Sequence, residues 1–195
     1  MTTVYFVRHA EPNYMNHDDM SRELTEKGIA DSKLVTQFLA DKNVDIVFSS
    51  PYKRAIDTIR DFAESSGLEI NLENDFRERK VDSVWIEDFV SFCKAQWMNF
   101  DYKLLDGESL QEVQTRNILA LNHVLGEHRN KTIIIGTHGT ALSTIINFYD
   151  KRFGYDHFQK IQGLMPWIVR FTFQNLDCTE IQTYNLFELL RSYSL

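Results

Sequence analysis

Two histidines stand directly after short apolar runs, and each has a neighbour that suits phosphate chemistry. His9 follows Arg8 at the end of the run 4–7, and His138 precedes Gly139 after another such run. A neutral imidazole held in one tautomer can attack phosphorus, and an arginine can bind phosphate oxygens through its planar set of N–H donors. Arg8 and His9 therefore combine a candidate nucleophile with a candidate anion clamp.

Runs of β-branched and aromatic residues predict the strands that position these groups. They cover residues 4–7, 44–48 and 132–135. The runs are continuous rather than alternating, which indicates strands buried on both faces of a mainly parallel sheet. Ligands of such sheets bind outside the carboxyl ends of the strands. Groups that follow different strands are therefore expected to meet at one edge.

Helical patterns separate these strands. Ser50 is predicted to cap the second helix, with Pro51 at its first position. This start brings Arg54 to the first turn, where it faces the same crevice as Arg8 and His9. The helices are predicted over residues 26–39, 51–66, 109–128 and 139–148, with Thr25 as the first cap and Gly67 following the second helix.

The rest of the chain completes one domain over residues 1–195. Residues 76–106 combine many aromatic side chains with many charges and predict a small helical cap inserted over the crevice, whose aromatics form its core. Residues 169–173 and 180–184 predict an antiparallel pair at one edge of the sheet. The expected architecture is a three-layer αβα sandwich with helices on both faces of the sheet.

Composition excludes several classes of function. With 21 Lys and Arg against 28 Asp and Glu, the net charge of −7 provides no basic field for nucleic acid or an anionic membrane. No stretch is long and apolar enough to span a bilayer, and no basic region precedes the first apolar run. Cys93 and Cys178 lie far apart, outside any metal-ligand spacing. We expect a cytoplasmic protein without a metal or other cofactor.

The ordered set of motifs resembles the histidine phosphatase superfamily, which includes the cofactor-dependent phosphoglycerate mutases. The resemblance covers nearly the whole chain. Its motifs lie at residues 8–10, 24–25, 49–54, 76–78, 107–110 and 137–139.

The resemblance implies a role for each residue of the site. His9 would take the phosphoryl group from a monoester, giving a phosphohistidine that water then hydrolyses. Arg8, Arg54 and His138 would surround the transferring group and stabilise its charge. Glu78 would protonate the departing alkoxide and later deprotonate the attacking water. Alternative proton donors are Asp75, Asp82 and Glu108.

Several neighbouring residues are further candidates or depart from the family pattern. Ala10 stands where most members have glycine, and Met15 stands where many have an asparagine that contacts phosphate. Asn13 lies close to that position. We include Asn13, Glu108 and Gly139 among the expected substrate-binding residues.

The expected activity is metal-independent hydrolysis of a small phosphorylated metabolite. The mutase branch of the family carries a longer insertion than the one between Glu78 and Gly107 here, which favours hydrolysis. The alternatives are a phosphoglycerate mutase-type phosphomutase, a phosphatase acting on a phosphoprotein, and a non-catalytic module that binds phosphate or another protein. The sequence does not indicate the oligomeric state.

Overall fold

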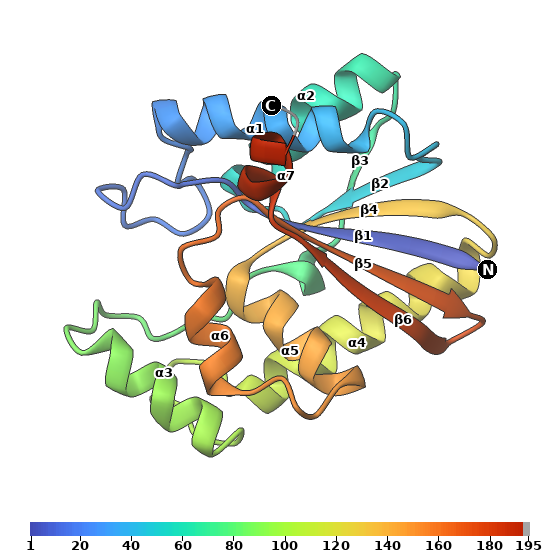
Figure 1. Cartoon of the computed structure of the whole chain (residues 1–195). Coiled ribbons are helices and arrows are strands. Elements are labelled where there is room, and N and C mark those ends of the chain that lie inside the picture. Colours follow the sequence, from blue (N-terminus) through green and yellow to red (C-terminus); the bar gives the residue numbers. More distant parts are fainter. Residues whose placement is uncertain (193–195) are drawn as a thin grey trace.

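The computed structural model describes residues 1–192, which form one six-stranded sheet between two layers of helices (Figure 1). The strands are β1 (Thr2–Arg8), β2 (Ile46–Ser49), β3 (Ile70–Leu72), β4 (Thr132–Thr137), β5 (Trp167–Gln174) and β6 (Asp177–Tyr184). Their order is β3-β2-β4-β1-β5-β6. The first four strands pair in parallel, whereas β5 is antiparallel to both β1 and β6. The predicted mainly parallel sheet and its antiparallel edge pair are confirmed.

Helices cover both faces of the sheet. Figure 1 shows α1, α2 and α7 on one face and α4 and α5 on the other, where α6 and α3 continue the layer beyond the carboxyl ends of the parallel strands. The helices are α1 (Glu26–Leu39), α2 (Lys53–Ser66), α3 (Phe89–Met98), α4 (Leu110–Glu127), α5 (Gly139–Tyr149), α6 (Tyr155–Ile161) and α7 (Leu186–Ser192), with a 3₁₀ turn η1 (Asn74–Phe76).

The apolar core lies on both sides of the sheet, because neighbouring residues of each strand point to opposite faces. Tyr5 and Val7 of β1 join the core under α1 and α2. Val4 and Phe6 join the core on the α4 and α5 side. Burial on both faces is what makes the sequence of β1 continuously apolar.

Local signals place the first and fourth helices where the sequence predicts them. The Thr25 hydroxyl accepts the Gly28 N–H at 3.0 Å and caps α1. Ser109 and Glu112 form a reciprocal capping box at the start of α4. Each cap satisfies backbone donors that the first helical turn leaves without partners.

The predicted start of the second helix is wrong by two residues. Helix α2 begins at Lys53 with Tyr52 as its N-cap, so Ser50 is not the cap and Pro51 is not its first residue. The Ser50 hydroxyl instead accepts the Tyr52 N–H at 3.2 Å and bonds to His138. Arg54 still lies in the first turn, and the left-handed Gly67 (φ 66°) ends the helix as predicted.

The segment predicted as a helical cap contains one helix, α3. Within it, Phe92 and Trp97 are buried in the main core. Trp85 and Phe89 are instead 65% and 42% exposed. The aromatic residues of this segment therefore divide between core and surface. Strand β3 and helices α6 and α7 were not predicted, because they are too short to show a hydrophobic period.

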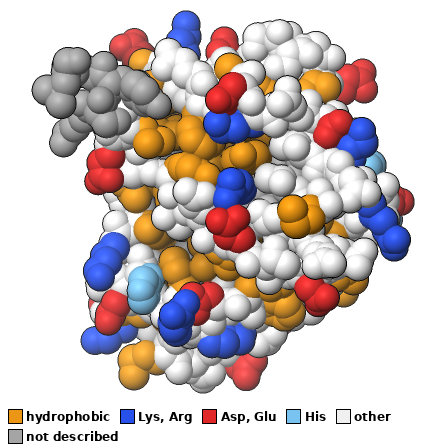
Figure 2. Space-filling model, turned by 45° about the vertical axis from the view of Figure 1, so that its right-hand side comes forward, with side chains coloured by type: hydrophobic (Ala, Val, Ile, Leu, Met, Phe, Trp, Pro, Cys, Tyr) orange, Lys and Arg blue, Asp and Glu red, His pale blue; other side chains and the backbone are white. Residues whose placement is uncertain are grey.

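Charges are mixed over the surface. On the face drawn in Figure 2, Lys and Arg side chains stand beside Asp and Glu side chains, with hydrophobic side chains between them. This face carries no continuous basic area, in keeping with the net charge of −7. Within residues 1–192, no helix has the length and apolar character needed to cross a membrane.

Two helical glycines allow a matched test of the packing beside the first motif. A Cβ on Gly28 would stand 2.2 Å from the Glu11 carbonyl oxygen, whereas one on Gly126 would meet nothing within 4 Å. We expect Gly28→Ala to lower the free energy of unfolding by about 1–3 kcal/mol. Gly126→Ala should raise it by up to about 1 kcal/mol, because alanine favours helix. Denaturant unfolding followed by circular dichroism measures the free energy of unfolding of both variants. Equal stabilisation by the two substitutions would contradict the close contact between Gly28 and Glu11.

Candidate active site

The two histidines meet because their strands are neighbours. Strands β1 and β4 pair in parallel, with Arg8 in register with Thr137. The next residues, His9 and His138, therefore leave the sheet side by side, and the His9 N–H donates to the Thr137 carbonyl at 3.1 Å. Their ring centroids are 5.3 Å apart with an interplanar angle of 61°. The sequence prediction that these groups share one edge of the sheet is confirmed.

One hydrogen bond sets the tautomer of His9. Its Nδ1 lies 2.7 Å from the carbonyl oxygen of Ala10. A carbonyl can only accept, so Nδ1 carries the proton and Nε2 keeps its lone pair in the neutral ring. Ala10 is itself fixed, because its N–H donates to the Thr58 hydroxyl at 2.9 Å. The residue that departs from the family pattern thus orients the candidate nucleophile through its backbone.

His138 has a different partner. Its Nε2 lies 2.8 Å from the Ser50 hydroxyl. That hydroxyl accepts the Tyr52 N–H and can donate its own proton to Nε2. The ring proton of a neutral His138 then resides on Nδ1, which is buried and has no partner within residues 1–192. A buried donor without a partner suits an oxygen of a bound anion.

Arg8 is held by the end of α6 and the loop that follows it. Its Nη1 donates to the Ile161 and Leu164 carbonyls at 2.6 and 3.1 Å, and its Nη2 donates to the Gln162 carbonyl at 3.1 Å. Its buried Nε has no partner within the described part of the chain. A Cβ on Gly139 would stand 3.0 Å from the guanidinium carbon. Gly139 thus provides the space in which this guanidinium lies.

Arg54 reaches the same region from the first turn of α2. The residue is 2% exposed. Its Nη1 donates to the Asp19 carbonyl at 2.6 Å, and its Nη2 lies 3.4 Å from the Asp19 carboxylate. The guanidinium also lies over the Tyr52 ring, 5.1 Å from its centroid. These contacts fix the direction of a buried cation.

Glu78 belongs to the loop after η1, and its carboxylate lies at the start of α5, the helix that follows His138. Its carboxylate accepts the Arg79 N–H at 2.8 Å, the Thr140 N–H at 3.1 Å and the Ala141 N–H at 3.2 Å. The first N–H groups of a helix lack partners inside the helix and favour a negative charge. Helix α5 therefore holds the Glu78 carboxylate beside the histidines.

Burial and the guanidinium charges determine the protonation of the site. Burial, followed by Arg54 and Arg8, lowers the pKa of His9 well below its ordinary value. Burial and then Arg54 do the same to the pKa of His138. Burial also lowers the pKa of both guanidiniums, and the nearby Glu78 charge partly opposes this shift. Neutral imidazoles among guanidinium cations can act as a nucleophile and bind an anion.

Glu108 lies in an ion-pair cluster behind this site. Its two oxygens accept from Arg77 at 2.9 Å, from Arg116 at 2.8 and 3.1 Å, and from the Lys80 N–H at 2.9 Å. Arg116 also donates to the carbonyl oxygens of Asp75, Arg77 and Glu78. Glu108 and Arg116 thus fix the loop that carries Glu78. Sequence reasoning missed Arg116, because its partners come from a distant loop.

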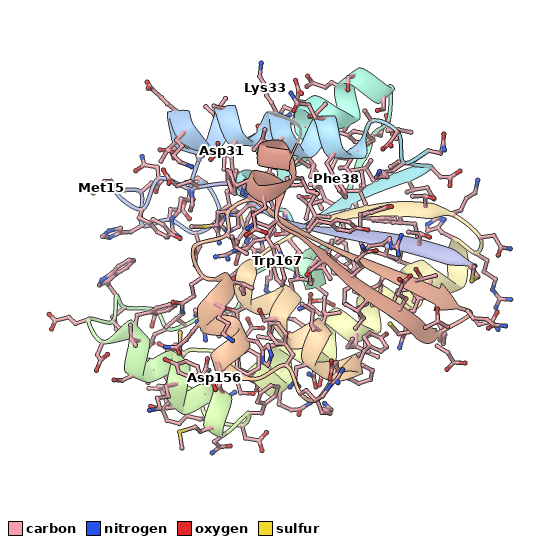
Figure 3. All side chains as sticks on the ribbon, viewed as in Figure 1. Met15, Asp31, Lys33, Phe38, Asp156 and Trp167 are labelled. Atoms are coloured by element: carbon pink, nitrogen blue, oxygen red, sulfur yellow. The ribbon has the colours of Figure 1, made fainter. Side chains whose placement is uncertain are left out.

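Asn13 is occupied by its own loop. Its amide donates to the Glu23 carboxylate, and its Oδ1 accepts the Met15 N–H at 3.1 Å. Met15 is 87% exposed and lies at the outer tip of the loop (Figure 3). Neither side chain joins the groups that converge around His9. These bonds instead shape the loop between β1 and α1.

Other features of the molecule lie away from this convergence. A hollow of about 370 Å³ is lined by residues of the α3 region, including Ile86 and Phe92, and one of about 310 Å³ is lined by residues of α5 and β6, including Tyr149. Neither is lined by the histidines or by the arginines that surround them. Within residues 1–192, no three His, Cys, Asp or Glu side chains are grouped so that they could hold a metal ion.

The fold and the converging groups define an α/β protein with a candidate anion site at the carboxyl ends of its parallel strands. Residues 4–185 match the model of the histidine phosphatase superfamily (branch 1), and the chain belongs to this family. The resemblance seen in the motifs is thereby confirmed.

Individual relatives are similar over most of their length. The chain is 28% identical to phosphoserine phosphatase 1 of Hydrogenobacter thermophilus over 155 residues, which cover 71% of each protein. It is 29% identical to a probable phosphoglycerate mutase of Erwinia tasmaniensis over 160 residues, covering 75% of this chain and 74% of that protein. The phosphoserine phosphatase of Entamoeba histolytica, solved with 3-phosphoglyceric acid, superposes with a TM-score of 0.75 at 23% identity, covering 95% of this chain and 99% of that one. The structural likeness establishes the shared fold.

The lowered pKa values predict how the protein responds to acid. His9 and His138 should stay neutral as the pH falls below 6.5, their ordinary pKa, as long as the protein is folded. In the unfolded chain these rings take up protons near pH 6.5, so the free energy of unfolding should fall as the pH drops below about 6.5. Imidazole NMR titration and denaturant unfolding measure the two effects. Protonation of either ring near pH 6.5 in the folded protein would contradict the assignment.

Proposed function

We propose that this protein is a metal-independent phosphomonoesterase that forms a phosphohistidine on His9. The observation that carries the proposal is the tautomer of His9. Its Nδ1 is bonded to the Ala10 carbonyl, which leaves the Nε2 lone pair among buried guanidiniums. A base that remains neutral beside cations can attack a phosphate dianion whose charge those cations bind.

The reaction proceeds in two displacements. Nε2 of His9 attacks phosphorus, the bond from phosphorus to the ester oxygen breaks, and the electron pair leaves with that oxygen. Glu78 supplies the proton that makes the leaving group an alcohol, and becomes the carboxylate that the N–H groups at the start of α5 stabilise. Water then attacks the phosphohistidine with Glu78 as the base. The P–N bond breaks, inorganic phosphate is released and the Nε2 lone pair is restored.

The cations act on the phosphoryl oxygens during both displacements. The Nε–H of Arg8 and the Nδ1–H of His138 are buried donors without partners within residues 1–192. With the Arg54 guanidinium they supply donors for the three equatorial oxygens. Because their directions are already fixed by Ser50 and by backbone carbonyls, little reorganisation is needed in the transition state.

We propose a small phosphorylated metabolite as the substrate and residues 76–106 as a cap on a single domain. Relatives named as a phosphoserine phosphatase and a probable phosphoglycerate mutase support a small phosphomonoester. The segment between Glu78 and Gly107 holds only α3, which favours hydrolysis over transfer to a second hydroxyl. Stoichiometric release of inorganic phosphate from a metabolite panel separates hydrolysis from the mutase alternative.

His9→Ala tests the nucleophile. We expect hydrolysis of an aryl phosphate by the wild-type protein to persist in excess chelator and to fall at least about 10³-fold in His9→Ala, because the covalent route is removed. His123→Ala is the matched control, since the His123 side chain is 66% exposed. The rate of hydrolysis by the wild-type protein and both variants is measured as steady-state release of phosphate. Equal rates for wild type and His9→Ala, or activity lost to the chelator, would overturn the mechanism.

Glu78→Gln tests the proton donor through the leaving group. An alkyl phosphate leaves as a strongly basic alkoxide that needs a proton, whereas a nitrophenyl phosphate leaves as a stable phenolate. We expect the substitution to slow phosphorylation of His9 by about 10²–10⁴-fold with the alkyl ester and far less with the aryl ester. Single-turnover kinetics with both esters measure this step. The same loss with both esters would show that Glu78 is not the acid.

A further inference from the structure

The loop between β1 and α1 carries a buried arginine that sequence reasoning did not assign. Arg22 is 8% exposed. Its Nε donates to the Asn16 carbonyl at 2.7 Å, and its Nη1 lies 2.9 Å from the Asp19 carboxylate. The guanidinium lies over the Tyr14 ring, 5.6 Å from its centroid. Arg22 is therefore held in one direction, with its Nη2 free of hydrogen bonds within residues 1–192.

Arg22 and Arg54 converge on a single point. The same Oδ1 of Asp19 that lies 2.9 Å from Arg22 Nη1 lies 3.4 Å from Arg54 Nη2. The two guanidiniums come from different elements, the β1–α1 loop and helix α2. The Asp19 side chain is 46% exposed, so solvent reaches the carboxylate that the two cations share. One oxygen of an anion can therefore contact both guanidiniums, as this carboxylate oxygen does.

The charge of Arg22 also reaches the nucleophile. Arg22 is one of three arginines that lower the pKa of His9, after Arg54 and Arg8. The charged and titratable groups around His9 are thus Arg8 from β1, Arg22 from the β1–α1 loop, Arg54 from α2, and His138 with Glu78 at the start of α5.

We infer that Arg22 binds the phosphate group of the substrate together with Arg54, and that Asp19 holds both guanidiniums on that point. The inference rests on the proposed function for the identity of the anion. A guanidinium binds a phosphate through two parallel N–H donors, and a charge-assisted pair of this kind is stronger than a neutral one. The alternative is that Arg22 binds a second anionic group of the substrate, such as a carboxylate.

The direct test is binding of inorganic phosphate, which has no second anionic group. Isothermal titration should show phosphate bound about 10- to 100-fold more weakly by Arg22→Met than by the wild-type protein. Arg22→Lys, which keeps the charge but loses the paired donors, should bind with intermediate affinity. Arg152→Met is the control, because the Arg152 side chain is 89% exposed and pairs only with Asp150 within the described residues.

Arg22→Gln keeps the test decisive if Arg22→Met does not fold. Its amide retains an N–H donor for the Asn16 carbonyl, and the same weakening of phosphate binding is expected. The titration of the nucleophile reports separately whether the Arg22 charge acts at His9. Removal of the Arg22 charge should raise the pKa of His9 towards its ordinary value, measured by imidazole NMR, while Arg22→Lys should move it less.

Two results would overturn the inference. One is wild-type affinity for phosphate in both neutral variants. The other is a loss that occurs only with carboxylate-bearing esters such as phosphoserine and leaves inorganic phosphate and aryl phosphate unaffected. Neither result depends on turnover. If the wild-type protein binds phosphate but hydrolyses no ester, the proposed function fails while the role of Arg22 is still decided by the binding constants.

Discussion

The hydrogen bond from His9 Nδ1 to the Ala10 carbonyl is the interaction on which the site depends. It places the ring proton on the side away from the reacting nitrogen. Burial and the surrounding guanidiniums keep the ring neutral, since both disfavour the imidazolium. A protonated or inverted ring would present an N–H where the reaction needs a lone pair. The backbone at residues 9 and 10 must therefore be rigid, and the Thr58 and Thr137 contacts of this segment make it so.

Buried cations are costly unless their donors are satisfied, and the fold meets this requirement with backbone carbonyls. Arg8 is held by three carbonyls at the end of α6 and in the loop after it, and Arg54 donates to the Asp19 carbonyl. Neutral acceptors fix a guanidinium without cancelling its charge. The positive charge thus remains available to an incoming phosphate, and the loops that supply the carbonyls become part of the site.

The sequence predicted the parts of the molecule that follow from burial and local capping. Strand β1 was identifiable because both its faces are buried, and α1 because Thr25 signals its start. Ser50 was misread because a serine before a proline is a common helix start, whereas its bond to His138 joins two distant segments. The same limit explains why Arg22 and Arg116 were not assigned. Their partners are set by loop conformation, which hydrophobic periodicity does not report.

Trapping the phosphorylated protein is the most direct measurement of whether Nε2 of His9 carries the phosphoryl group. The protein is mixed with a labelled phosphomonoester, quenched in alkali within the first turnover, digested and mapped by mass spectrometry. We expect base-stable, acid-labile label on the peptide that contains His9, attached at Nε2. Label at Nδ1 or on another residue, or turnover without any labelled protein in the first turnover, would contradict this expectation.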